Sequence, residues 1–167
     1  MEVVGNCLYV ESENTRLLID AGVSLKKIEA GLEKLNISPS SIDGVLVTHE
    51  HSDHIQSLGN LSKKFDLPVF ANRETFDAMP KQTDKISENN INNFKVTENF
   101  FINDIEITPF SIPHDAANPC GFSISCNDDK ISIATDIGHM TPQIIKQLEG
   151  SKFILLESNY DSEVLKY

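Results

Sequence analysis

The stretch Thr48–His54, written THEHSDH, gathers three of the five histidines of the chain together with an aspartate. It directly follows the apolar run GVLV, which reads as a buried strand. His49 and His51 are two residues apart, so an extended backbone places both side chains on one side. Two imidazoles at a rigid strand end are typical ligands of one metal ion. Asp53 and His54 come after a turn and suit a second ion nearby, so we expect a metal site rather than a polar turn.

Further donors of the same kind follow two other expected strands. His114 comes directly after the strand 105–111, and Asp136 comes directly after the strand 130–135. The ends of buried strands commonly carry site residues, because the chain leaves the core there at an open edge. We therefore expect His114 and Asp136 to join the histidine cluster as metal ligands.

Two more polar residues near strand ends read differently. Asp20 in LLIDAG suits either a turn or a carboxylate that orients a ligand histidine through its second ring nitrogen, and we favour the second role. His139 follows a glycine in a loop before an expected helix. We expect it to be solvated or to support the ligands from outside, and we do not count it as a ligand.

The elements that hold these residues follow from hydrophobic periodicity and turn residues. A polar SENT turn joins two short β-like runs into an expected hairpin, and the Asn-rich segment 87–94 reads as a loop. Mixed strands with covering helices predict a sandwich of sheets with helices outside. The strands are expected at 7–11, 16–19, 44–48, 68–71, 94–96, 105–111, 121–126, 130–135 and 153–156, and the helices at 25–35, 55–65, 73–79 and 141–148.

Length and composition narrow the class of function. The 167 residues suffice for one domain with a core, and no apolar run is long enough to predict a membrane span. Three cysteines without paired spacing indicate buried thiols in a reducing, cytoplasmic setting rather than disulfides or a cysteine-rich zinc site. The net charge of −11 opposes generic nucleic-acid binding, which depends on Lys and Arg. Bound divalent ions would reverse the local field, so a nuclease stays open.

At THEHSDH the chain resembles the metallo-β-lactamase-fold hydrolases, whose signature is H-x-H-x-D-H. The resemblance covers nearly the whole chain and implies an α+β fold, an αββα four-layer sandwich with an incomplete second half. The upstream aspartate of the family matches Asp20, and its ligand positions match His49, His51, Asp53, His54, His114 and Asp136. A finer resemblance to the YycJ/WalJ-type bacterial proteins, regarded as cytoplasmic metal-dependent exonucleases of DNA, rests on GNCLYVES, RLLIDAG, VTHEHSDHI, PHDAANPCGF, ATDIGHMTP and LLESNYD.

The resemblance implies hydrolysis of a phosphodiester at a dinuclear site. Two divalent ions, zinc or manganese with iron as a further option, would share Asp136 and a bridging hydroxide. Asp53 would bind one ion and orient the hydroxide, which makes it the expected catalytic residue. Two readings stay open beside a DNA exonuclease. One is a small-molecule hydrolase acting on a thioester, lactone or cyclic phosphodiester, and the other is a catalytically inactive metal-binding module.

The chain departs from the family pattern in length and in one ligand. Relatives run on for many more residues and supply a last ligand histidine near the C-terminus. This chain has no such histidine, and it carries Tyr160 in ESNYD where relatives often have His. Residues 1–167 are therefore expected to form one partial domain of the family, shortened at both ends. Apolar surface that the missing part normally covers is expected to cause low stability or assembly into a homo-oligomer.

Overall fold

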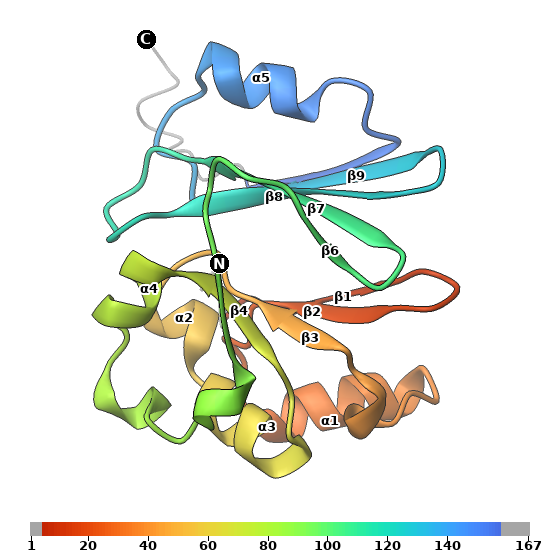
Figure 1. Ribbon diagram of the computed structural model, residues 1–167, viewed down its shortest axis with the longest axis vertical. Coiled ribbons are helices and arrows are strands. Elements are labelled where there is room, and N and C mark those ends of the chain that lie inside the picture. The colour runs from red at the N-terminus through yellow and green to blue at the C-terminus, as the bar shows by residue number, and fades with distance from the viewer. Residues whose placement is uncertain (1–4, 158–167) are drawn as a thin grey trace, which may run out of the picture.

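Two five-stranded β-sheets lie face to face, with helices on both outer faces (Figure 1). The computed structural model describes residues 5–157, so Tyr160 lies outside the described part. The predicted α+β fold, an αββα four-layer sandwich, is confirmed. Within residues 5–157, none of the helices combines the length and the apolar character needed to cross a bilayer.

The N-terminal sheet has the strand order β1-β2-β3-β4-β5. β1 and β2 form the expected antiparallel hairpin, and the other neighbours run parallel. Because β2 to β5 point the same way, their carboxyl ends share one edge of the sheet. The strands are β1 (Leu8–Glu11), β2 (Arg16–Ile19), β3 (Gly44–Leu46), β4 (Val69–Asn72) and β5 (Ile91–Phe94).

The C-terminal sheet has the order β10-β9-β8-β7-β6. β6 to β9 form an antiparallel meander, and β10 lies parallel to β9. Asn127 takes the left-handed conformation in the tight turn between β8 and β9, a conformation that asparagine tolerates well. The strands are β6 (Phe100–Ile102), β7 (Ile105–Ser111), β8 (Cys120–Cys126), β9 (Asp129–Ala134) and β10 (Phe153–Leu156).

Four α-helices cover the outer face of the N-terminal sheet, and α5 covers the C-terminal sheet (Figure 1). α1 shows how a helix packs on the sheet: it turns Ile28 and Leu32 inward, one helical turn apart. The helices are α1 (Leu25–Lys34), α2 (Ser52–Ile55), α3 (Leu58–Phe65), α4 (Arg73–Ala78) and α5 (Pro142–Leu148), with short 3₁₀ helices at Pro39–Ser41, Lys81–Thr83 and Glu88–Asn90.

The core has two main layers, one on each side of the N-terminal sheet. Leu17 and Ile19 of β2 point into the space between the sheets, where they pack with Phe122. Leu18 points the other way and packs with Ile28 under the helices. This alternation follows from the pleat of a strand, and burial on both faces explains why β2 reads as an almost unbroken apolar run.

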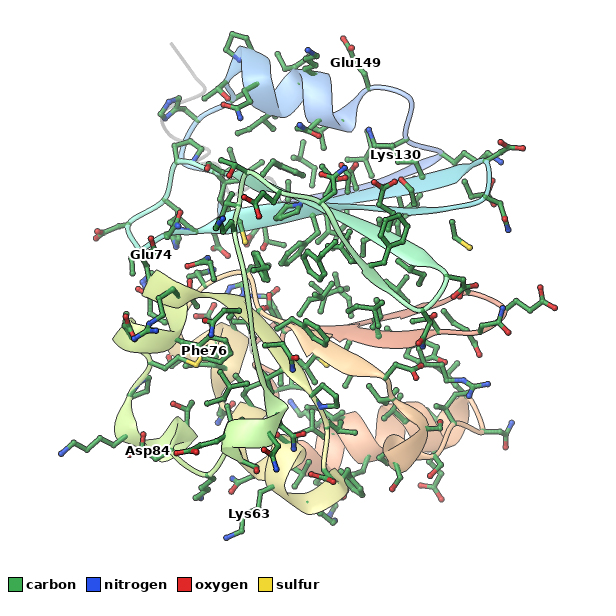
Figure 2. The ribbon with its side chains drawn as sticks, viewed as in Figure 1. Lys63, Glu74, Phe76, Asp84, Lys130 and Glu149 are labelled. Atoms are coloured by element: carbon green, nitrogen blue, oxygen red, sulfur yellow. The ribbon has the colours of Figure 1, made fainter. Side chains whose placement is uncertain are left out.

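Lys130 anchors α5 to the C-terminal sheet. Its Nζ donates hydrogen bonds to the carbonyl oxygens of Gln147 at 2.6 Å and Glu149 at 2.9 Å. Figure 2 shows Lys130 on the sheet beneath α5, with Glu149 at the carboxyl end of that helix. A cation there satisfies free carbonyls and the negative end of the helix dipole. Because α5 directly follows the loop with Asp136, the anchor also restricts that loop.

The structure differs from the predicted elements at three places. The helix expected at 55–65 begins only at Leu58, as α3, and Ile55 ends the separate helix α2. Ser57, in the turn between them, donates a hydrogen bond of 2.7 Å from Oγ to the carbonyl oxygen of Val23. The loop prediction for 87–94 is wrong over β5, where pairing with β4 overrides the low strand preference of asparagine. The strand expected at 94–96 overlaps β5 only at Phe94, and β6 was not expected.

Candidate metal centre

The donor residues that the sequence singles out meet at one end of the two sheets. His49 follows β3, His51 stands at the start of α2, His114 follows β7 and Asp136 follows β9. In Figure 1 the loops after these strands gather at the left-hand end of the sandwich. His51 and His114 are 63 residues apart in the chain, yet His51 Nδ1 lies 3.2 Å from His114 Nε2. The two sheets therefore contribute to one cluster.

His49, His51 and His114 form the first group of donors. One ligand atom from each lies within 4.8 Å of the other two. The ring centroids are 4.6 to 4.9 Å apart, and the rings stand nearly perpendicular to one another. Perpendicular rings can direct three nitrogens at one point without steric overlap. Three imidazoles around a point match a tetrahedral metal site with one position left for water or substrate.

His49, His54 and Asp136 form the second group. The rings of His49 and His54 have centroids 4.0 Å apart. Asp136 Oδ2 lies 2.8 Å from His54 Nε2 without the alignment of a hydrogen bond, so their contact is electrostatic. His49 belongs to both groups, which makes the two candidate cation positions adjacent. Asp136 groups with His54 rather than with His51 and His114, so its bridging role stays a prediction.

Asp53 stands at the rim of the cluster rather than inside either group. Its Oδ2 lies 3.6 Å from His54 Nε2, and its side chain is 44% exposed. α2 turns the more buried His54 inward and leaves Asp53 half-open to solvent. The structure therefore brings the predicted catalytic carboxylate to the solvent-exposed edge of the cluster. Its roles as ligand and catalyst remain predictions.

Asp20 has the supporting position expected of it. The side chain is buried, and Oδ1 and Oδ2 each accept a hydrogen bond of 2.9 Å from Thr48, one from its backbone N and one from its Oγ1. Oδ2 also lies 2.7 Å from His54 Nδ1. A carboxylate only accepts, so His54 Nδ1 carries the proton and Nε2 faces Asp136.

Thr48 links Asp20 to His49 and so also sets which ring nitrogen of His49 carries the proton. Its hydroxyl proton goes to Asp20, so the Thr48 oxygen is an acceptor toward His49 Nδ1, 3.0 Å away. His49 Nδ1 therefore carries the proton, and His49 Nε2 presents a lone pair to the cluster. One buried carboxylate thus fixes the tautomers of both histidines.

The buried atoms that lack partners show that a cation fits this arrangement. Among residues 5–157, His49 Nε2 is buried without a hydrogen-bond partner, and Asp136 Oδ2 is buried with only its electrostatic contact to His54. Unpaired buried polar atoms are costly, at about 1 to 3 kcal/mol each, and a bound cation would remove that cost. Nitrogen and carboxylate oxygen together suit zinc, manganese or iron.

The pKa values of the two central histidines move in opposite directions. Burial, together with the charge of His54, lowers the pKa of His49 to about 3, so His49 is neutral at pH 7. Burial alone would also lower the pKa of His54. The close carboxylates of Asp136 and Asp20 outweigh burial and raise the pKa of His54 to about 10. Without metal, a proton on His54 therefore occupies the place of the second cation.

Two strand ends at the site share an unusual backbone. Asp20 after β2 has a φ of 62°, and Asp136 after β9 has a φ of 54°, both in the left-handed region that few residues adopt. Each is followed two residues later by a glycine in close contact with a ligand-bearing segment. A Cβ on Gly22 would lie 1.5 Å from the Asp53 carbonyl oxygen, and one on Gly138 would lie 2.8 Å from the Pro113 carbonyl oxygen.

Two residues at the site escaped the sequence interpretation. Asn6 Nδ2 lies 2.9 Å from His54 Nε2, and Glu157 Oε2 accepts a hydrogen bond of 2.9 Å from the backbone N of Asp136. Asn6 lies in GNCLYVES, a segment that carries the resemblance, but the sequence predicts no role for this residue. Glu157 follows β10, and a strand parallel to β9 brings it beside Asp136. His139 is exposed in the loop after Asp136.

A family model described as a beta-lactamase superfamily domain matches residues 15–165. An exodeoxyribonuclease YycJ from Bacillus anthracis is 38% identical over 97% of this chain and 61% of its own length. The chain therefore spans about three fifths of the length of that relative. That residues 1–167 form one partial domain stays a prediction.

Solved structures show the same fold. The crystal structure of Zn²⁺-bound PqqB from Methylobacterium extorquens superimposes with a TM-score of 0.79 at 16% identity, covering 95% of this chain and 62% of that one. The metallo-beta-lactamase fold protein YhfI from Bacillus subtilis gives a TM-score of 0.74 at 18% identity, covering 96% of this chain and 66% of that one. The predicted resemblance is confirmed: the chain belongs to the beta-lactamase superfamily and has the metallo-β-lactamase fold.

Proposed function

We propose that the protein is a metal-dependent phosphodiesterase, and specifically a DNA exonuclease that uses a dinuclear metal site with a bridging hydroxide. The observation that carries this proposal is the pair of donor groups that share His49. Two adjacent cations are the arrangement that hydrolases use to hold the attacking and leaving oxygens of a phosphoryl group. The name exodeoxyribonuclease, borne by the relative that matches 97% of this chain, supports DNA as the substrate.

The residues divide between the two cations as follows. His49, His51 and His114 would hold the first, while His54 and Asp53 would hold the second, and Asp136 would be shared between them. When bound, two such ions supply a water of lowered pKa and draw charge from the phosphoryl oxygens. The donors are nitrogen and oxygen, which favours zinc or manganese, with iron as a further option.

Cys120 does not compete as a ligand, although it is close in space. Its Sγ faces the carbonyl oxygen of Thr48 at 3.5 Å, and the side chain is fully buried. Burial raises the pKa of the Cys120 thiol well above its ordinary value. Neither donor group among the described residues includes a cysteine, so the proposed site is a histidine and carboxylate centre.

The roles of the protein side chains in the reaction follow from their exposure. Asp53 is half-open to solvent and 3.6 Å from His54 Nε2, so it can both bind and orient the attacking water. Asp20 is buried and touches the reaction only through the histidines that it orients. Asp136 is held by Glu157 through its backbone N, which keeps its carboxylate facing His54.

A small-molecule hydrolase acting on a thioester, lactone or cyclic phosphodiester is the second candidate, and the net charge of −11 favours it. DNA carries one charge per phosphate, and acidic proteins bind it poorly without basic residues or bound cations. A third reading is a metal-binding module without turnover. We further propose that the protein acts in the cytoplasm. We also propose that copies of the chain associate, because the apolar side chains of Phe153, Ile154 and Leu156 on β10 are exposed.

The first experiment measures metal content and hydrolysis together. The protein loaded with Mn²⁺ or Zn²⁺ is expected to cleave bis(p-nitrophenyl) phosphate, and His49→Ala is expected to abolish cleavage because His49 belongs to both groups. His139→Ala is the matched control, since it removes an exposed imidazole outside both groups. Elemental analysis that finds no more than trace metal in the loaded wild type overturns the proposal.

A second experiment decides between DNA and small molecules. An exonuclease degrades linear DNA with free ends and leaves closed circular DNA intact. The same preparation is tested against a thioester, a lactone and a cyclic phosphodiester. Turnover of linear DNA alone supports the exonuclease. Turnover of a small ester without DNA cleavage supports the second candidate, and full metal loading without any turnover supports the third.

A further inference from the structure

The loop that carries His114 joins β7 and β8 of the C-terminal sheet and contacts residues at or after the ends of strands of the N-terminal sheet. His114 follows β7, whereas His49 and His51 belong to the opposite sheet, so the first donor group exists only if the loop is held across the gap. Hydrophobic packing between sheets does not fix a loop at their edge to the accuracy that a metal ligand needs. Backbone hydrogen bonds from Gly138 N to the Pro113 carbonyl oxygen and from Cys120 N to the Thr48 carbonyl oxygen hold the two ends of the loop. The polar contacts of residues 115–119 hold its middle, next to His114.

Glu50 makes one of these contacts. It lies between His49 and His51, so in an extended segment its side chain points away from theirs. Its Oε1 accepts a hydrogen bond of 2.8 Å from the backbone N of Ala117, three residues beyond His114. The other oxygen, Oε2, is buried and has no hydrogen-bond partner among the described residues. Removing a carboxylate partly from water costs free energy, and one hydrogen bond to a backbone N–H offsets little of that cost. A contribution to stability alone is therefore a poor explanation for the position of Glu50.

Asn72 makes the second contact, from the end of β4. Its Nδ2 donates a hydrogen bond of 2.8 Å to the carbonyl oxygen of Asn118. Its Oδ1 accepts a hydrogen bond of 2.9 Å from the backbone N of Thr75, which caps α4. The side chain is buried, so both partners are fixed. Figure 2 shows Glu74 in the first turn of the same helix, on the side toward the loop, where it makes a longer contact of 3.3 Å with Asn118 Nδ2.

We propose that Glu50 and Asn72 are positioning residues that fasten the His114 loop to the N-terminal sheet and so complete the first donor group. The role rests on the proposed metal site. The three residues of the His49–His51 segment then have different roles. His49 and His51 would bind the cation, and Glu50 between them holds the loop that contains His114. Neither Glu50 nor Asn72 touches the reacting atoms.

Three substitutions separate this role from others. Glu50→Ala removes the acceptor of the Ala117 amide, whereas Glu50→Gln keeps an oxygen acceptor and removes only the charge. Asn72→Asp keeps an oxygen that caps α4 but replaces the donor toward the Asn118 carbonyl with an acceptor. Glu33→Ala, on an exposed face of α1, is the control for loss of one negative charge away from the site.

Two measurements are made on each variant. A Co²⁺ titration followed by visible absorption reports the affinity and the coordination number of the bound ion. Hydrogen exchange of the Ala117 amide in the metal-free protein reports the fastening itself. We expect Glu50→Ala and Asn72→Asp to weaken the first Co²⁺ site by about 10- to 100-fold and to change its spectrum, as losses of ligand-supporting contacts do. Glu50→Gln and Glu33→Ala are expected to stay close to wild type.

The outcomes distinguish the fastening from the metal site. If the wild type binds no Co²⁺, the proposed function fails, while loss of Ala117 amide protection in Glu50→Ala still supports the fastening. If Glu50→Gln weakens Co²⁺ binding as much as Glu50→Ala, the charge of Glu50 matters rather than its hydrogen bond, and the positioning role is refuted. Wild-type affinity and spectrum in both Glu50→Ala and Asn72→Asp refute it as well.

Discussion

Asp20→Asn tests the orientation of both central histidines with a change of one atom. The carboxylate of Asp20 accepts from the Thr48 backbone N, from Thr48 Oγ1 and from His54 Nδ1. An asparagine keeps the shape and one acceptor oxygen. Its NH₂ group must then face either His54 or Thr48, where donors already point at it. A metal ligand must be a neutral imidazole, and in that state we expect the variant His54 to carry its single proton on Nε2 rather than Nδ1, so that the nitrogen facing Asp136 has no lone pair for the cation.

The size of the effect follows from the hydrogen bond that is lost. A hydrogen bond to a charged group contributes about 1.5 to 3 kcal/mol, and about 1.4 kcal/mol corresponds to a tenfold change in affinity. The loss of the His54 contact alone therefore weakens binding of the second cation by about 10- to 100-fold. The first cation would be held in part by His49, which Asp20 orients only indirectly through Thr48, so the affinity of that cation is expected to fall by less.

The assay is a Mn²⁺ or Zn²⁺ titration by calorimetry, with metal content measured after dialysis. Asp43→Asn is the matched control. Asp43 lies just before the first residue of β3, at the end of the strand away from His49, and its carboxylate also accepts a hydrogen bond from a backbone N, that of Arg16, at 2.8 Å. Nitrogen-15 chemical shifts of the imidazoles report the tautomer directly. Two cations bound with wild-type affinity in Asp20→Asn, or an unchanged His54 tautomer, would refute this account of Asp20.

Two further predictions concern pH and backbone packing. The raised pKa of His54, about 10, stabilises the metal-free protein fully below pH 6.5, and this contribution is lost as the pH rises through 10. A cation that replaces the His54 proton is expected to bind about tenfold more tightly for each pH unit between pH 7 and 9. Calorimetry in buffers of different ionisation enthalpy should then detect the release of a proton on metal binding, and the absence of proton release would contradict this prediction. Gly22→Ala is expected to cost about 3 kcal/mol in urea unfolding, because its Cβ would overlap the Asp53 carbonyl oxygen. Gly31→Ala on α1, where a Cβ meets nothing within 4 Å, is expected to be neutral or stabilising, and equal losses in both variants would contradict the packing argument.

The sequence predicts the parts of this structure that depend on local pattern. The spacing of His49 and His51 is local, and the apolar strand before them is recognisable without any partner. The meeting of His114 and Asp136 with that pair was predictable because all of them end strands and match a family signature. The αββα arrangement followed from the same resemblance. Where local pattern and tertiary structure agree, reading from sequence succeeds.

The parts that could not be predicted depend on partners distant in the chain. β5 reads as a loop because its asparagines are poor strand formers, and only the ladder with β4 makes it a strand. Asn6 and Glu157 approach the site from the two ends of the described chain, and neither has a local signature. Glu50 looks like a spacer between ligands until the position of Ala117 is known.

The two left-handed aspartates of the site are each held by polar contacts. Each sits at the end of a strand in a strained conformation, and such strain persists only where surrounding contacts over-determine it. For Asp20 those contacts are the bonds to Thr48 and His54, and for Asp136 they are the Glu157 carboxylate and the His54 ring. His54 therefore links both strained turns. Because the same ring also belongs to the second donor group, a cation bound there would act on a side chain that contacts both aspartate turns.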